Sequence, residues 1–133
     1  MPIAVAYEHD NRICVVTFTG LLDLVDYADV VRREHRAVFD KATRPIHTIL
    51  DLTGLRLHGI PKNVLTDALR LNQMRHPMDG IAIIVTRDSI VTRFAEIFIR
   101  VLRSPRFTLC RSLDEAQLKI QAVIADEDQA AQA

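Results

Sequence analysis

The most informative stretch of the chain is Ile46–Leu55, with the sequence IHTILDLTGL, followed by Gly59–Asn63, with the sequence GIPKN. Its apolar run predicts a buried strand over 46–52, its polar residues predict a turn, and Pro61 suits the first position of a helix. Open α/β sheets bind ligands at the carboxyl ends of strands and the amino ends of helices, so we expect function here. The stretch nevertheless holds no nucleophile–base pair, no metal-ligand cluster and no glycine-rich phosphate loop.

On both sides of this stretch the hydrophobic pattern alternates between strand and helix. Alternating residues predict strands over 3–8, 12–19 and 106–109, and the continuous run Ile81–Val85 predicts a central strand buried on both faces. Helical spacing predicts helices from Asp23, over about 61–75, over 90–103, and after Ser112, which forms a capping-box pattern with Glu115. The sequence therefore predicts an α/β fold with a mixed, mostly parallel five-stranded sheet and four helices, in the order ββαβαβαβα.

Length and composition limit the classes of protein. The 133 residues predict a single domain over 1–125 and a short, frayed polar tail over 126–133. Lys plus Arg and Asp plus Glu number 17 each, and a net charge of zero argues against nucleic-acid binding. No apolar run approaches the roughly 18 residues of a membrane span, and no secretory signal is visible. Cys14 and Cys110 suit buried free thiols, so we expect a cytoplasmic protein.

Several local features resemble a known domain. They are the order of elements, the turn at Gly20, the strand end Leu50–Thr53 and the finish Leu113–Ala116. Together they are similar to the STAS domain, the fold of bacterial anti-sigma-factor antagonists. The spacing looks most like the SpoIIAA-like branch of small stand-alone proteins, which are also compared with the lipid-binding Sec14 group. The resemblance covers nearly the whole chain and implies a regulatory module that binds other proteins.

One motif of that family is missing. STAS antagonists carry an Asp-Ser-Ser/Thr-Gly motif at the start of the second helix, and its serine is the phosphorylation switch. The corresponding stretch here is His58–Pro61, with the sequence HGIP, which contains no hydroxyl group. Thr53 lies one turn too early, and Thr66 lies inside the predicted helix. We therefore carry over no phosphoacceptor residue.

The amino end of the helix over 61–75 is the first candidate site. Ile60, at the cap position, has no side-chain oxygen to pair with the helix's unbonded N–H groups. Arg56, His58 and Lys62 lie close in sequence, so a carboxylate or phosphate could bind there. The alternative is that water satisfies the N–H groups and that the cations are merely solvated.

The helix over 90–103 is the second candidate. It is apolar over roughly 200° of its circumference, although packing on a sheet requires a stripe only somewhat wider than about 100°. The helix over 61–75, a second subunit or an apolar ligand could cover the excess. The candidate interface or pocket residues are Ile90, Phe94, Ala95, Phe98, Ile99 and Leu102.

Other chemistry has little support. The five histidines lack metal-ligand spacing, and Asp51, which could be a catalytic carboxylate, more often caps the turn that follows it. The basic run over 32–36 suits a solvated helix face. We predict no catalytic residue, metal or cofactor. The chain is expected to be a non-enzymatic STAS-like interaction module, as a homodimer or with an unidentified protein partner. The alternative is a small-molecule or lipid-binding protein with an apolar pocket between the helices over 61–75 and 90–103.

Overall fold

The computed structural model describes residues 3–20, 31–55, 63–73 and 76–132. Its five strands form one sheet, and their spatial order is their sequence order: β1 (Ile3–Glu8), β2 (Ile13–Gly20), β3 (Ile46–Leu55), β4 (Asp79–Val85) and β5 (Phe107–Cys110). β1 runs antiparallel to β2, and all other neighbouring strands are parallel. The predicted mixed, mostly parallel five-stranded sheet is therefore confirmed.

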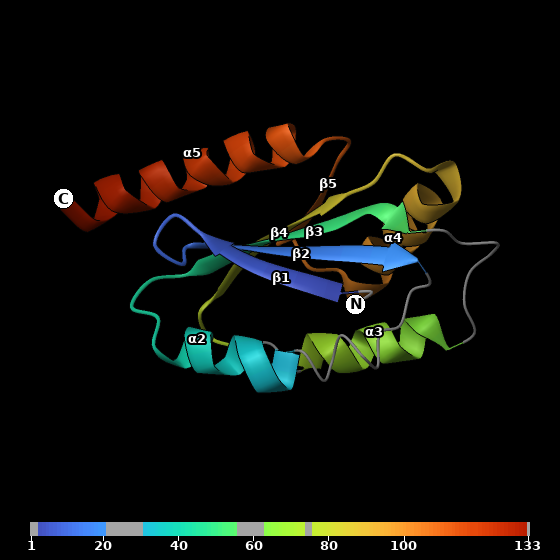
Figure 1. Cartoon of the computed structure of the whole chain (residues 1–133), viewed down its shortest axis with the longest axis horizontal. Helices are drawn as coiled ribbons and strands as arrows, with labels where there is room; N and C mark the ends of the chain where they lie inside the picture. The colour runs from blue at the N-terminus through green and yellow to red at the C-terminus, as the bar shows by residue number, and fades with distance from the viewer. Residues whose placement is uncertain (1–2, 21–30, 56–62, 74–75, 133) are drawn as a thin grey trace.

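Helices cover both faces of this sheet. They are the π-helical η1 (Val31–His35), which continues into α2 (Arg36–Asp40), and α3 (Val64–Gln73), α4 (Ser89–Leu102) and α5 (Leu113–Gln132). In Figure 1, α5 lies on one side of the sheet, and α2 and α3 lie in a row on the other. The expected starts near Asp23 and Pro61 fall outside the described residues, so the count of four helices stays a prediction.

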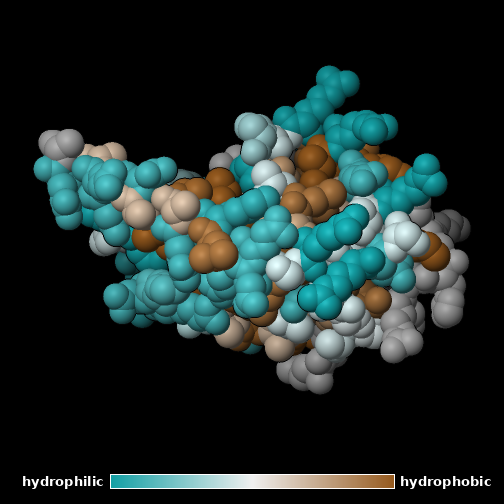
Figure 2. Space-filling view, turned by 90° about the horizontal axis from the view of Figure 1, so that it is seen from above, coloured by the Kyte–Doolittle hydropathy of each residue, from teal (hydrophilic) through white to brown (hydrophobic). Residues whose placement is uncertain are grey.

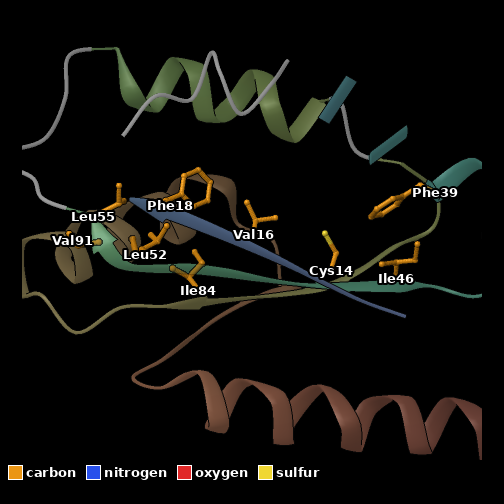
Figure 3. Close-up of a cluster of buried hydrophobic side chains, with 10 residues drawn as sticks. Cys14, Val16, Phe18, Phe39, Ile46, Leu52, Leu55, Ile84 and Val91 are labelled. Carbon is orange, nitrogen blue, oxygen red and sulfur yellow. The ribbon is translucent and has the colours of Figure 1, made fainter. Parts of the chain in front are cut away.

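The strands alternate their side chains between two apolar layers. The larger layer contains Cys14, Val16 and Phe18 of β2 and packs against Phe39 of α2 and Val91 of α4 (Figure 3). The second layer contains the other set of strand residues and packs against α5; its members are Ile13, Val15, Ile49, Ile83, Val85, Cys110, Ala116 and Ile120. The sheet is thus buried on both faces, as the continuous apolar run in β4 predicts.

Side-chain caps fix the starts of the last two helices. Asp88 is the N-cap of α4, and its carboxylate accepts hydrogen bonds from the N–H groups of Ile90 and Val91. Ser112 Oγ accepts a hydrogen bond from the N–H of Glu115 at 3.1 Å, as the capping-box pattern predicts. In the chain, β5 therefore stands between two helices, α4 and α5, whose first turns are each capped by a side chain.

The carboxyl-terminal residues differ from their expectation. α5 continues to Gln132, so the segment expected to be a frayed tail is helical. Glu127 and Asp128 in this segment form ion pairs with residues more than 80 positions earlier in the chain. Contacts over such sequence distances leave no local pattern, and composition alone therefore suggested fraying. Among the described residues no helix is long and apolar enough to cross a membrane.

Candidate functional site

Near the carboxyl ends of the parallel strands, where function was expected, described polar side chains form local hydrogen bonds. Asp51 Oδ1 accepts from Thr53 N at 3.0 Å and from Thr53 Oγ1 at 2.6 Å. On the neighbouring strand end, the buried Thr86 Oγ1 lies 3.2 Å from Thr92 Oγ1. The turn expected after residue 52 is strand, because β3 continues to Leu55, so Asp51 does not cap a turn. Its carboxylate is nevertheless engaged locally, by Thr53 two residues on.

The predicted anion site cannot be placed. Arg56, His58, Ile60 and Lys62 all lie in segment 56–62, outside the described residues. The site stays a prediction from sequence.

A cysteine of β2 and a histidine lie in contact where η1 continues into α2. Cys14 Sγ lies 3.9 Å from His35 Nε2, and the His35 ring stacks on Phe39 with 5.9 Å between ring centroids. The edge of His35 also meets the Tyr7 ring. No local pattern predicts this pair, because its members stand 21 positions apart.

Burial sets the protonation of this group. It raises the pKa of the Cys14 thiol to about 12 and that of the Tyr7 hydroxyl above its ordinary value. Burial also lowers the pKa of His35, partly opposed by the charges of Asp79 and Glu34. The thiol is therefore protonated and the imidazole neutral near pH 7. A cysteine nucleophile needs the opposite, a thiolate beside a cation.

A second buried histidine lies at the amino end of the parallel strands. His47 Nδ1 accepts a hydrogen bond from Ile81 N at 2.9 Å, so Nε2 carries the proton and donates it to Glu127 Oε1 at 2.6 Å. A Cβ atom on Gly80 would stand 2.1 Å from His47 Nδ1. The absence of a side chain at Gly80 is thus what allows His47 to lie across β4 and reach α5.

Two arginines extend this contact into the C-terminal ion-pair network, which comprises Arg12, Arg44, His47, Glu127 and Asp128. Arg12 contacts Asp128 at 2.7 Å and Glu127 at 3.3 Å, and Arg44 pairs with the same Asp128 oxygen. An open cleft of about 310 Å³ lies beside it, lined by Asp10, Asn11, Arg12, Val38, Lys41, Ala42, Thr43, Arg44 and Ile46. Because the guanidinium groups already hold carboxylates, the network anchors the end of α5.

The residues proposed as an interface on α4 separate into two groups. Phe94 and Ala95 are buried in the core, which corrects their placement at an interface or pocket. Phe98, Ile99 and Leu102 are half-buried, and the Phe98 ring meets the Phe107 ring edge-on at 5.5 Å. Intramolecular packing therefore covers much of the apolar excess. Ile90 remains exposed, at 43%.

An apolar strip on the outer side of α4 remains, formed by Ile90, Ile97 and Val101 and called here the α4 stripe. Their spacing of seven and four residues places them within about 40° on a helix. Val101 is 41% exposed and Ile97 is half-buried. Ile97 and Val101 were not among the candidate interface residues, because a helical wheel does not show which side of the helix meets the sheet. Figure 2 shows, on the α5 side of the molecule, apolar residues in separate groups bordered by hydrophilic ones.

No group of three or more His, Cys, Asp or Glu side chains that could hold a metal ion occurs in the described part of the chain.

Solved structures of other proteins share the fold of this chain. No protein-family description and no curated protein sequence matches the chain. One similar solved structure is an uncharacterized protein of the DUF3478 family with a SpoIIAA-like fold from Shewanella loihica. It is 17% identical, with a TM-score of 0.62, and the match covers 89% of this chain and 91% of that one. Another is an anti-sigma factor antagonist from Mycobacterium paratuberculosis, 18% identical, with a TM-score of 0.57 and coverage of 90% and 94%. The chain therefore has a SpoIIAA-like fold, and the resemblance drawn from its sequence is confirmed at the level of fold.

Proposed function

We propose that this protein is a non-enzymatic interaction module that regulates other proteins by binding them, without a phosphoacceptor serine at the start of α3. The fold it shares with an anti-sigma factor antagonist supports a regulatory role. The observation that carries the proposal is the α4 stripe, because apolar side chains this exposed on a helix otherwise packed on the core are typical of a contact surface.

Two features support the non-enzymatic part of the proposal. Burial keeps the Cys14 thiol protonated and His35 neutral, which does not suit nucleophilic catalysis. Asp51, which the sequence offered as a catalytic carboxylate, lies within β3 and bonds to Thr53 two residues on.

The finer form of the proposal is a homodimer through α3 and α4. Leu69 supports it, because this α3 side chain is 42% exposed although α3 lies beside α4. An apolar side chain presented in this way is suited to an isologous contact with a second copy. An unidentified protein partner is the other form.

Native mass spectrometry of the freshly purified chain tests the proposal. We expect a dimer mass without adduct, and a monomer mass for Leu69→Asp, since a carboxylate buried in an interface is costly. The matched control is Leu118→Asp on α5, also exposed, which should leave the dimer intact. A monomer mass for the wild type would overturn the homodimer. A retained adduct of a few hundred daltons, the usual ligand scale, would favour the alternative of a small-molecule or lipid-binding protein.

A further inference from the structure

The open cleft beside the C-terminal ion-pair network is lined by positive charge. It lies between the turn from β1 to β2, the end of α2 and the start of β3. Its charged lining residues are Arg12, Lys41 and Arg44, with Asp10 as the acidic one. Three cationic side chains against one carboxylate leave a net charge of plus two, although the whole chain is neutral. A cleft of this charge is suited to a small anion.

The end of α5 supplies carboxylates to this cleft. Asp128 Oδ1 accepts hydrogen bonds from Arg12 Nη1, at 2.7 Å, and from Arg44 Nη1. Glu127 Oε1 accepts another from Arg12 Nη2 at 3.3 Å. Figure 1 shows the end of α5, the turn between β1 and β2 and the loop before β3 at the same end of the molecule. The two arginines of the cleft thus already bind carboxylates, and these two negative charges balance the charge of the lining.

This part of α5 is held by polar contacts rather than by packing. Ile124 is the last residue of α5 that packs in the second apolar layer. The Arg44 and Asp128 side chains are 41% and 44% exposed, and an ion pair this open to water contributes little stability. Acidic residues near the carboxyl end of a helix also oppose its dipole, and α5 has no basic residue in its last turn. The last two turns are therefore the part of α5 that is most easily released.

The carboxylates of α5 do not satisfy every donor around the cleft. Arg12 is 16% exposed, and its Nε atom is buried without a hydrogen-bond partner among the described residues. A buried donor without an acceptor destabilises the arrangement that leaves it unpaired. Lys41 is exposed, and no acidic side chain in the described part of the chain pairs with it. The docked end of α5 is consequently an incomplete match to the cleft.

We propose that this cleft binds a small anion that carries two or more negative charges on phosphate or carboxylate groups, and that the end of α5 is its tethered competitor. Arg12 and Arg44 hold the anion by charge-assisted hydrogen bonds, and Lys41 adds a third cation. Because the same guanidinium groups hold Asp128, binding of the anion releases the last two turns of α5 and shifts the population towards the open form. The inference uses neither the α4 stripe nor Leu69, so it stands or fails separately from the proposed function.

Isothermal titration calorimetry of the full chain tests the competition, with pyrophosphate and succinate as separate probes at constant ionic strength. We expect Asp128→Asn to bind at least one probe about tenfold more tightly than the wild type, because the competing carboxylate is gone. Asp126→Asn is the matched control. It removes the same charge from an exposed residue of the same helix that pairs with no described cation, and it should leave the affinity unchanged. The probe that binds more tightly identifies phosphate or carboxylate as the preferred group.

Two further measurements locate the site. Arg44→Gln in the background of Asp128→Asn should abolish the gain in affinity, whereas Arg36→Gln, which alters an exposed arginine of α2 outside the cleft, should retain it. In the wild type the anion should speed hydrogen exchange of the amides over 126–132 and leave those over 116–120 unchanged. Equal affinities of the two asparagine variants, slower exchange at the end of α5, or no binding of either probe up to about 10 mM would overturn the inference.

Discussion

On one face of the sheet, η1, α2, α3 and α4 share the cover; on the other, α5 lies alone. The shared face is rich in aromatic rings and contains the half-buried Tyr7 beside the buried Cys14 and His35. The α5 face is aliphatic, and the C-terminal ion-pair network anchors the far end of its helix. Several helices thus divide one face among them, whereas the single helix on the other face is held both by an apolar centre and by a polar anchor.

The largest effect is expected in the apolar centre of the α5 face. Ile120 is fully buried against the sheet, and replacing it with Ala leaves a cavity that the surrounding strands cannot fill. Ile120→Ala should lower the free energy of unfolding by about 3 kcal/mol, measured by urea denaturation. Ile124→Ala, a partly buried neighbour on the same helix, is the matched control and should cost clearly less. Equal costs at the two positions would show that α5 is not centred on Ile120.

The polar anchor should contribute less than the apolar centre. Gly80→Ala places a Cβ atom against the His47 ring, so the ring must move and lose its bonds to Ile81 and Glu127. We expect a cost of about 2 kcal/mol in the same assay. In the background of His47→Ala the same substitution should cost much less, because the clash is gone. If the cost is the same in both backgrounds, His47 is not the reason for glycine at this position.

The smallest effect is a slope with pH on the shared face. Burial lowers the pKa of His35 in the folded state below the ordinary value of 6.5, so below that pH the unfolded chain binds more protons. Stability should therefore fall as pH drops below about 6.5, and His35 should have no effect above it. In His35→Leu this part of the slope should disappear. His76→Gln, which alters a less buried histidine, should retain it. An unchanged slope in His35→Leu would refute the assignment.

The sequence predicted the sheet because each strand carries its own local pattern. Alternating apolar residues predicted β1, and the apolar run Ile81–Val85 predicted the carboxyl part of β4. The Ser112 cap predicted the start of α5 correctly, but no local sequence pattern predicted that this helix extends to Gln132. The interface or pocket on α4 stays a prediction, because a helical wheel shows that a helix is widely apolar without showing which side a neighbour covers. Phe94 and Ala95 are core, and the exposed Val101 was not among the candidates.

Local periodicity, caps and turns thus determined which segments of this protein become strands and helices, because those preferences act over a few residues. The tertiary structure decided which distant side chains meet. It brought Cys14 to His35, brought Arg12 and His47 to the end of α5, and left β5 at the edge of the sheet. Such meetings depend on strand order and helix placement, which the packing of the whole chain fixes.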